Sequence, residues 1–314
     1  MTNTTPPLSG IITPLVTPMD DDGFIDTVSL RRLVRFQLDS GITAVFPLGT
    51  TGEVSFLSDT QRELVVQTVV DEVAGRVPVL AGIVESSAAR AIDAGQTAVR
   101  AGADYLVATG PYYGSLSDRE VIRHFETIAD ALDRPVIAYD IPFKTHQKLA
   151  LDVVLDLAAN KTVHGLKDSS GDFWAFRTLT AKLRRTDFLL FTGSEPMVDA
   201  ALLMGADGAV VGIANIDPAG FLAIYQAAVA GDWDSARTHQ ERIARLGDIM
   251  SVGFGHGLGT EASFIGGLKQ ALVHLGVIDS AVTAAAASYP QAAAAEVAQI
   301  LEREGLLNRA GDAS

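Results

Sequence analysis

A lysine, two tyrosines and a pair of threonines occur in this sequence at or just after the ends of short apolar runs. Lys167 closes the run Val163–Lys167 and is followed by the small, polar turn Asp168–Asp172. A neutral lysine amine is a nucleophile, and burial favours the neutral form. If the run is a strand of an α/β barrel, Lys167 lies at the end where such barrels keep their chemistry. The alternative is an ordinary surface lysine just past a strand.

The segment Gly49–Glu53 has the sequence GTTGE and follows another apolar run. Backbone amides in a turn bounded by glycines can form an anion-binding concavity, and the hydroxyls of Thr50 and Thr51 would be further donors. The segment is too short for a phosphate-binding P-loop and lacks the lysine of that motif. It could therefore cradle a carboxylate, although an ordinary turn would have the same composition.

Tyr113 lies in the short segment Pro111–Gly114, and Tyr139 ends a run that continues into Asp140–Pro142. A phenol can pass a proton to and from a substrate oxygen. A tyrosine at a strand end can also be an amphipathic rim residue with a satisfied hydroxyl. The functional interpretation depends on whether one fold brings these strand ends to the same face as Lys167.

A short apolar strand, a polar or glycine-containing loop and an amphipathic helix recur along the chain. The predicted strands are Gly10–Val16, Thr43–Leu48, Pro78–Ile83, Tyr105–Thr109, Pro135–Tyr139, Val163–Lys167, Phe188–Thr192 and Ala209–Gly212. The predicted helices are Asp26–Ser40, Asp59–Ala74, Ala88–Ala101, Asp118–Leu132, Leu151–Ala159, Trp174–Leu183, Met197–Met204 and Ala219–Ala230. Apolar strands alternating with helices indicate a parallel sheet covered by helices, and eight such units favour a closed (β/α)8 TIM barrel.

Beyond residue 231 the pattern is helical only. Helices are predicted at Trp233–Met250, at Thr260–Leu275 and over the alanine-rich stretches Ala281–Ala287 and Ala292–Leu301. We therefore expect residues 1–231 to form the barrel. Residues 232–314 should form a C-terminal helical extension packed on it, and this extension is a candidate oligomer contact.

Composition limits the classes of partner and compartment. The chain has 24 Lys and Arg against 38 Asp and Glu, a formal net charge of −14, which argues against nucleic acid or an anionic membrane surface as a partner. The absence of cysteine excludes disulfides, thiolate nucleophiles and thiolate metal sites. The first residues lack the basic start and apolar core of a signal peptide, and no apolar run reaches the length of a membrane span. We expect a cytoplasmic protein.

The motifs together resemble a known family. GTTGE at Gly49–Glu53, PYY at Pro111–Tyr113, YDIP at Tyr139–Pro142 and GLKDSSGD at Gly165–Asp172 are similar, in order and spacing, to the dihydrodipicolinate synthase and N-acetylneuraminate lyase family. The resemblance implies a class I aldolase or related dehydratase on an (α/β)8 barrel with C-terminal helices. It also implies a homotetramer, built as a dimer of dimers, that uses no metal and no diffusible cofactor.

The resemblance also assigns roles to residues. Lys167 would form a Schiff base with a 2-oxo acid, usually pyruvate, and Tyr139 would be the proton-transferring phenol, with Thr50 in the relay. The turn that begins at Gly49 would hold the carboxylate through Thr50 and Thr51. Tyr113 would reach into the active site of a neighbouring subunit.

Substrate choice depends on positions where this chain departs from the family. Lys144 stands where the synthases generally have an arginine for the second substrate's carboxylate, and it lacks arginine's bidentate fork. Glu195 retains one member of the acidic pair with which the lyases grip a polyhydroxyl tail. Ser169 keeps a hydroxyl beside the lysine, whereas a serine expected after the last strand is replaced by Gly212, followed by Ile213.

These departures favour a carbon–carbon lyase that reversibly cleaves a 2-keto-3-deoxy sugar acid or an N-acetylneuraminate-like substrate into pyruvate and a polyhydroxy aldehyde. Two alternatives within enzymes are 4-hydroxy-tetrahydrodipicolinate synthase activity, on pyruvate and aspartate semialdehyde, and a sugar-acid dehydratase that uses the same lysine. A catalytically silent 2-oxo-acid-binding protein is the alternative from another class.

Overall fold

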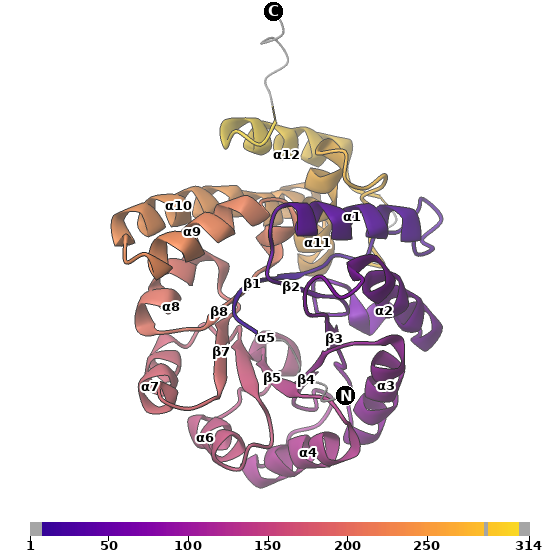
Figure 1. The fold of residues 1–314 in the computed structure, drawn as a ribbon. Helices are drawn as coiled ribbons and strands as arrows, with labels where there is room; N and C mark the ends of the chain where they lie inside the picture. Colours follow the sequence, from indigo (N-terminus) through magenta and orange to yellow (C-terminus); the bar gives the residue numbers. More distant parts are fainter. Residues whose placement is uncertain (1–7, 286–287, 308–314) are drawn as a thin grey trace, which may run out of the picture.

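A computed structural model describes residues 8–285 and 288–307 and contains a barrel of parallel strands inside a ring of helices (Figure 1). The strands are β1 (Gly10–Pro14), β2 (Ala44–Phe46), β3 (Leu80–Gly82), β4 (Tyr105–Thr109), β5 (Val136–Asp140), β6 (Gly165–Asp168), β7 (Leu189–Thr192) and β8 (Gly208–Val210). They follow one another in the order β2-β1-β8-β7-β6-β5-β4-β3. A parallel bridge between Val45 and Val79 joins the two outer strands, so the sheet closes on itself. The predicted (β/α)8 barrel is confirmed.

The strands are almost wholly apolar because both of their faces are buried. On β4, Tyr105 and Val107 belong to the cluster that fills the barrel interior. Leu106 and Ala108, which alternate with them, belong to the larger cluster between the strands and the helices. Successive side chains of a strand point to opposite faces, so this alternation fixes which residues can reach the interior.

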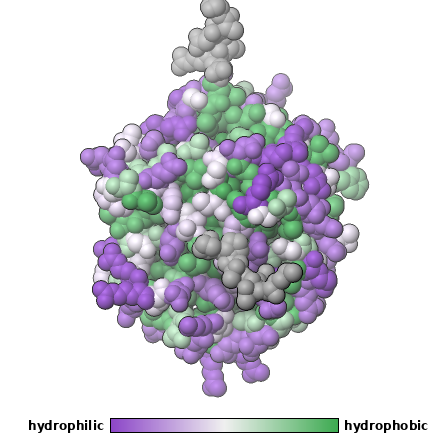
Figure 2. All heavy atoms as spheres, in the orientation of Figure 1, coloured by the Kyte–Doolittle hydropathy of each residue, from purple (hydrophilic) through white to green (hydrophobic). Residues whose placement is uncertain are grey.

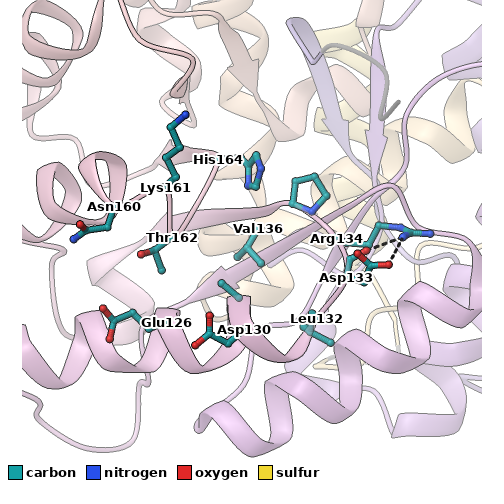
Figure 3. Close-up of a pocket in the computed structure, with 12 residues that line it drawn as sticks. Glu126, Asp130, Leu132, Asp133, Arg134, Val136, Asn160, Lys161, Thr162 and His164 are labelled. Carbon is teal, nitrogen blue, oxygen red and sulfur yellow. Dashed lines mark hydrogen bonds and ion pairs between the residues drawn. The ribbon is translucent and has the colours of Figure 1, made fainter. Parts of the chain in front are cut away.

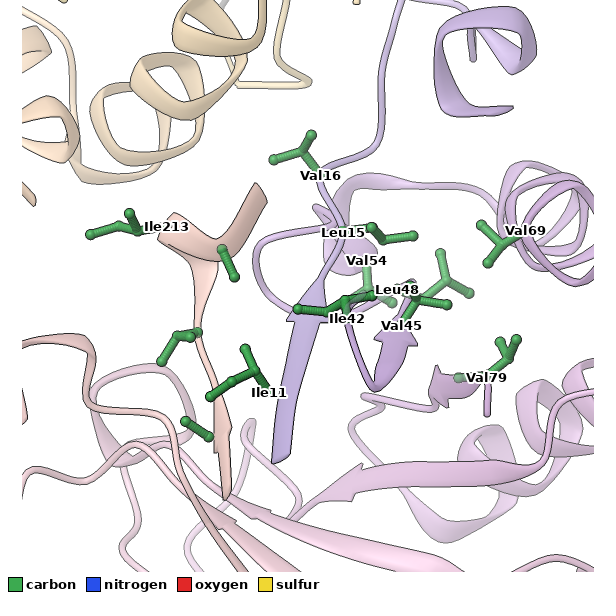
Figure 4. Packing of buried hydrophobic residues seen from close by; sticks show 14 of the residues in the cluster. Ile11, Leu15, Val16, Ile42, Val45, Leu48, Val54, Val69, Val79 and Ile213 are labelled. Carbon is green, nitrogen blue, oxygen red and sulfur yellow. The ribbon is translucent and has the colours of Figure 1, made fainter. Parts of the chain in front are cut away.

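The apolar layer outside the strands joins the barrel to its helices. Ile11 of β1, Val45 of β2 and Val69 of the helix α2 (Asp59–Val73) all belong to this layer, part of which is shown in Figure 4. Burying side chains of this size contributes about 1.5–3 kcal/mol each to folding. The strands are thereby held rigidly enough to place polar groups at their ends.

Helices follow each strand, and several short 3₁₀ turns lie in the loops. The helices of the ring are α1 (Thr27–Asp39), α2, α3 (Ala88–Ala101), α4 (Asp118–Ala131), α6 (Leu151–Ala159), α7 (Phe173–Leu183), α8 (Val198–Met204) and α9 (Pro218–Val229). The short helix α5 (Pro142–Thr145) lies inside this ring in Figure 1. The 3₁₀ turns are η1 (Val54–Phe56), η2 (Glu195–Met197), η3 (Gly212–Asn215), η4 (Gly247–Met250) and η5 (Val252–His256). Side-chain caps start several of the helices: the Asp172 carboxylate, for example, accepts from the Ala175 amide at 2.9 Å at the start of α7.

Three helices follow the ring: α10 (Trp233–Leu246), α11 (Thr260–His274) and α12 (Gln291–Arg303). In Figure 1 α12 lies outside the ring, and it packs against α11. The predicted boundary between barrel and extension at residues 231 and 232 stays a prediction.

The structure corrects two predicted helices of this region. The helix predicted over Trp233–Met250 ends at Leu246 and continues as the 3₁₀ turn η4. The helix predicted over Ala281–Ala287 is wrong for residues 281–285, which are not helical, and its last two residues lie outside the described ones. Backbone groups of this segment bond to buried side chains of other elements instead of to a helical turn.

The predicted strands were too long where an apolar run continues into a loop. The strand predicted over Ala209–Gly212 ends at Val210 and is followed by η3, and the one predicted over Gly10–Val16 ends at Pro14. The loop residues in question are buried, and burial gives loop and strand residues the same apolar character.

Polar side chains cover most of the rim of the molecule in the view of Figure 2, over the outer surfaces of the surrounding helices. Among the described residues, no helix combines the length and the apolar character that a membrane crossing requires.

Candidate active site

Lys167 lies inside the barrel at the C-terminal end of β6. Leu166 packs into the outer apolar layer, so the next side chain points inward. Lys167 pairs in register with Tyr139 of β5 and is 5% exposed. Its Nζ lies 4.0 Å from the centroid of the Tyr139 ring and 5.1 Å from that of Phe46. No hydrogen bond or ion pair of this Nζ is formed within the part of the chain that the structure describes, so the amine is available to a ligand.

Tyr139 connects the lysine to the loop after β2. Its hydroxyl lies 3.5 Å from the Thr50 Oγ1. The loop is a tight turn, in which the Gly52 amide donates to the Gly49 carbonyl and the Glu53 amide to the Thr50 carbonyl, both at 3.0 Å. A Cβ on Gly52 would lie 3.0 Å from backbone atoms of neighbouring segments, so the turn requires glycine there. The lysine, the phenol and the threonine thus form one continuous group.

A cavity of about 360 Å³ opens above these residues at the C-terminal end of the strands. Eight of the predicted site residues line it: Thr50, Thr51, Tyr139, Lys144, Lys167, Ser169, Glu195 and Gly212. The C-terminal region contributes Met250, Thr260, Glu261 and Phe264 to the same wall, which the sequence did not indicate. The site is therefore built from both the barrel and the helices that follow it.

Three predicted site residues lie outside this lining. Gly49 supports the turn through its carbonyl, and Ile213 faces the site only through its amide, which donates to Glu195. Tyr113 is 94% exposed and does not line the cavity of its own chain.

Glu195 is a buried carboxyl group in the cavity wall. Its Oε1 accepts from the amides of Gly212 at 2.5 Å and Ile213 at 3.2 Å, while Oε2 has no partner among the described residues. Burial raises the pKa of Glu195 to about 7, against the opposing effects of the two amides and of the Lys167 charge. A Cβ on Gly212 would lie 2.9 Å from Oε1, so a side chain at this position would displace the Glu195 carboxyl group from its present place.

Lys144 is paired with an acidic residue of the C-terminal region. It lies on α5 and forms an ion pair with Glu261, in the first turn of α11. Glu261 was not identified from the sequence, because nothing local in a helix start indicates which barrel loop it will contact. The charge of Lys144 is thus already compensated at the mouth of the cavity.

A second ion pair fixes the turn after Lys167. Asp140 accepts from the Lys148 Nζ at 2.7 Å and from the Leu149 amide at 3.1 Å, and Lys148 also donates to the Ser170 Oγ at 3.0 Å. Burial raises the pKa of Asp140, and the bonds from Lys148 and Leu149 oppose that rise. The Asp140 carbonyl also accepts from the Ser169 amide at 2.8 Å, so the turn is anchored to β5.

Buried side-chain oxygens without a partner gather at this end of the barrel. Among the described residues they include Thr109 Oγ1 at the end of β4, Asp168 Oδ2 at the end of β6 and Glu195 Oε2 after β7. Buried polar atoms in native proteins are almost always bonded. Of these three oxygens, Glu195 Oε2 belongs to a residue that lines the cavity, where a ligand can supply the missing partner.

A larger cavity, of about 700 Å³, lies at the opposite end of the barrel (Figure 3). Its wall includes Val136 at the start of β5 and His164 just before β6, with Glu126 and Asp130 from α4. Chemistry in barrels of this kind is kept at the other end of the strands. None of the buried, unpartnered side-chain atoms identified above lines this larger cavity, and we place the candidate active site at the C-terminal end.

Comparison with known proteins identifies the family of this chain. Residues 7–303 match the model of the dihydrodipicolinate synthetase family. The chain belongs to that family. It is accordingly an enzyme, a lyase of the Schiff-base type.

Individual relatives cover most of both chains. The 4-hydroxy-tetrahydrodipicolinate synthase of Stutzerimonas stutzeri is 36% identical over 239 residues, which are 76% of this chain and 82% of that one. The solved structure of dihydrodipicolinate synthase from Bacteroides thetaiotaomicron has a TM-score of 0.88 at 33% identity and covers 95% of this chain and 99% of its own. YagE, a prophage protein of Escherichia coli K12 solved in complex with pyruvate, has a TM-score of 0.88 at 28% identity, with 96% and 99% covered.

Proposed function

We propose that Lys167 forms an imine with pyruvate and that the enzyme reversibly cleaves a 2-keto-3-deoxy sugar acid or an N-acetylneuraminate-like substrate. The observation that carries this proposal is a buried lysine without an anionic partner among the described residues, placed against a phenol in a cavity that is also lined by Glu195 with its unpartnered Oε2. The pyruvate complex of YagE, a protein of the same fold, supports the identity of the 2-oxo acid.

In the proposed reaction the Lys167 amine attacks the ketone carbon of the substrate, and the ketone oxygen leaves as water. The protonated imine then accepts the electron pair of the carbon–carbon bond that breaks, which leaves an enamine and releases an aldehyde. Tyr139 takes the proton from the hydroxyl that becomes the aldehyde oxygen, with Thr50 as its relay. Protonation of the enamine and addition of water release pyruvate and regenerate the amine.

The GTTGE turn is proposed to hold the carboxylate of the 2-oxo acid. Thr50 and Thr51 both line the cavity, and Thr51 is buried. Hydroxyls and amides held by a closed turn bind an anion without having to reorganise. This places the carboxylate on the same side of the cavity as the hydroxyl of Tyr139.

The residues near the cavity mouth support a hydroxylated, uncharged aldehyde as the second product. In the described part of the chain, Lys167 and Lys144 are the cationic side chains that line the cavity, and Lys144 is paired with Glu261. Glu195 offers an unpartnered carboxyl oxygen, which can bond a substrate hydroxyl. Among the described residues of the cavity, a second substrate with its own carboxylate would find no unpaired cation besides Lys167, the proposed nucleophile.

The second candidate is 4-hydroxy-tetrahydrodipicolinate synthase activity, which condenses pyruvate with aspartate semialdehyde. It is favoured by the relative of that name at 36% identity. A sugar-acid dehydratase that uses Lys167 is a third candidate, and the raised pKa of Glu195 supports it, because a protonated carboxyl group can donate to a leaving hydroxyl.

We also propose that the protein is a homotetramer in the cytoplasm. Tyr113 is 94% exposed in the single chain, as expected for a side chain that completes the site of a neighbouring subunit. Trp174 of α7 and Leu203 of α8 are 84% and 59% exposed and would belong to a second contact. Large exposed apolar side chains on neighbouring helices are typical of subunit interfaces.

Trapping tests the shared chemistry. The protein is incubated with pyruvate, reduced with borohydride and digested, and mass spectrometry should find the adduct on Lys167. An adduct on another lysine, or none, would overturn the proposed mechanism.

A substrate screen separates the three enzymes. Pyruvate is offered with glyceraldehyde, N-acetylmannosamine or aspartate semialdehyde, and sugar acids are assayed for dehydration. We expect the hydroxylated aldehydes to be preferred. In addition, Glu195→Gln should raise KM for the hydroxylated substrate more than it changes imine formation. A preference for aspartate semialdehyde would establish the synthase instead.

A further inference from the structure

A second buried lysine reaches the proposed carboxylate-binding turn from the C-terminal region. Lys269 of α11 forms an ion pair with Glu53, the last residue of the GTTGE motif, with 2.5 Å between Nζ and Oε1. The two side chains are 0% and 1% exposed. The pair lies between elements that are far apart in the sequence, the loop after β2 and a helix beyond the barrel.

Both charged groups have further partners. The Lys269 Nζ also donates to the Val282 carbonyl at 2.7 Å, and the second carboxylate oxygen of Glu53 accepts from the Ala284 amide at 2.7 Å. Burial lowers the pKa of Lys269, and the Glu53 carboxylate opposes that effect. Three segments are therefore joined at one point, and one of them is the stretch where the predicted helix does not form.

The backbone at Glu53 has an unfavourable conformation that this pair can hold. Its φ of 59° and ψ of 28° lie in the left-handed region, which is costly for a residue with a Cβ. In this conformation the Glu53 amide donates to the Thr50 carbonyl at 3.0 Å. The position of the Glu53 side chain is thereby coupled to the geometry of the turn that carries Thr50 and Thr51.

We propose that Glu53 and Lys269 are positioning residues for the active site, through which the C-terminal region sets the geometry of the turn that binds the 2-oxo acid. This inference rests on the proposed function, because it assigns the turn to the carboxylate of pyruvate. It gives α11 and the segment 282–284 a role in substrate binding that is separate from any contact between subunits.

A purely stabilising role explains the pair less well. Replacing a buried ion pair by apolar side chains of similar volume is often neutral or stabilising, because desolvation offsets the attraction. A fully bonded charged pair does, however, define one arrangement of the groups around it. Its location beside the proposed relay residue Thr50, in a turn with a strained backbone, agrees with a positioning role.

The test compares Glu53→Gln, Lys269→Met and the double variant, which removes both charges. For each protein we would measure the melting temperature and the pyruvate concentration that gives half-maximal trapping on Lys167. Both single variants should raise that concentration by about tenfold to a hundredfold, the scale on which misplaced groups cost binding and rate. The double variant should recover much of the melting temperature, since no lone charge stays buried, but not the pyruvate dependence.

Glu304→Gln is the matched control. Glu304 is also a buried carboxylate of the C-terminal region, and it accepts from Arg245 at 3.2 Å and Arg303 at 2.9 Å, neither of which belongs to the turn. This variant should lower the melting temperature and leave the pyruvate dependence unchanged. Wild-type pyruvate dependence in the folded single variants and the double variant would overturn the positioning role.

Hydrogen exchange of the peptide covering residues 49–57 separates this inference from the proposed function. Exchange should accelerate in the Glu53 and Lys269 variants and not in Glu304→Gln, whether or not pyruvate binds. If the wild type traps no pyruvate but exchange accelerates, the turn is held as we propose and the assigned substrate is wrong. Unchanged exchange would contradict the positioning role directly.

Discussion

The two buried lysines of this protein occupy opposite kinds of environment. Lys167 is 5% exposed and lies over aromatic rings, and it has no carboxylate bonded to it within the described residues. Lys269 is fully buried and bonds both the Glu53 carboxylate and a backbone carbonyl. Burial alone therefore does not distinguish a nucleophile from a structural cation. The difference lies in whether the protein supplies the counter-charge.

The difference in partners affects how tightly each lysine is held and whether its amine is available to react. Burial lowers the pKa of Lys269, and the attraction of the Glu53 carboxylate offsets part of that effect. Lys167 has no such partner among the described residues, and an amine attacks a carbonyl through its free electron pair. The Lys167 amine is therefore available to a substrate, whereas the Lys269 amine is held by fixed partners. Substitution of Lys167 should abolish activity, and substitution of Lys269 should lower stability.

The largest effect is expected at the first site. Lys167→Met should abolish lyase activity and borohydride trapping, because no other described lysine faces the phenol of Tyr139. Its free energy of unfolding should not fall, since the change removes a buried amine that has no charged partner. Activity assays and urea unfolding check both statements. Residual imine formation would show that Lys167 is not the nucleophile, and a marked loss of stability would show that its amine has a structural role.

The next largest effect is expected at Lys269 and concerns stability instead of activity. Lys269→Met leaves the Glu53 carboxylate buried without its cation, which should cost about 3–5 kcal/mol of the free energy of unfolding. The variant should still form the imine at saturating pyruvate, because Lys167 is intact. Urea unfolding and trapping at high pyruvate measure these two quantities. A loss of less than about 1 kcal/mol, the scale of a solvent-exposed pair, would show that the pair is weaker than its burial implies.

The sequence predicted the first lysine but not the second, for a physical reason. The end of a strand and the alternation of its side chains are local properties, so the sequence alone places Lys167 and Tyr139 on one face of one barrel end. Lys269 lies in the middle of a helix, and its partner Glu53 was known only as the end of a motif. Only the fold brings such distant residues together.

The same limit explains the other differences. Glu261 and Lys148, which pair with Lys144 and Asp140, were not identified, because ion pairs that involve loop residues leave no periodic pattern in the sequence. The alanine-rich stretch Ala281–Ala287 has high helix propensity, yet part of its backbone bonds Glu53 and Lys269. Helix propensity thus gave a wrong prediction for the described part of this stretch, because the stretch makes a tertiary contact that we associate with function.

Glu195 gives a pH-dependent test of the comparison, because it is a carboxyl group whose charge interacts with Lys167. Its pKa of about 7 lies above the ordinary value of 4.5. Between these values the unfolded chain has lost the proton while the folded chain keeps it, so stability from this group is present at low pH and is lost as the pH rises to about 7. With about 1.4 kcal/mol for each tenfold difference in proton affinity, the total loss is about 3 kcal/mol.

Glu195→Gln should therefore remove this fall in stability. The amide oxygen can still accept from the amides of Gly212 and Ile213, so the site should keep its shape. Urea unfolding between pH 4.5 and 8 should show the variant gaining about 3 kcal/mol relative to the wild type over that range. Parallel curves for the two proteins would mean that Glu195 is ionised throughout, and the first lysine would then have an anion near it after all.

The smallest effect concerns Lys144, whose environment is intermediate between those of the two buried lysines. Its ion pair with Glu261 is partly exposed, with side-chain exposures of 31% and 27%, and pairs of this kind contribute about 0–1 kcal/mol. Glu261→Gln should release Lys144 to a substrate carboxylate, lowering KM for aspartate semialdehyde by up to about fivefold, the equivalent of 1 kcal/mol.

KM for glyceraldehyde, which has no charge, is the internal control and should stay unchanged. Equal changes for both aldehydes would show that Glu261 shapes the wall of the cavity and does not neutralise Lys144. A lower KM for aspartate semialdehyde alone would mean that the Glu261 carboxylate, by pairing with Lys144, disfavours aldehydes that carry a carboxylate. An ion pair of a lysine would then affect substrate choice, as well as the local order that we attribute to the pair at Lys269.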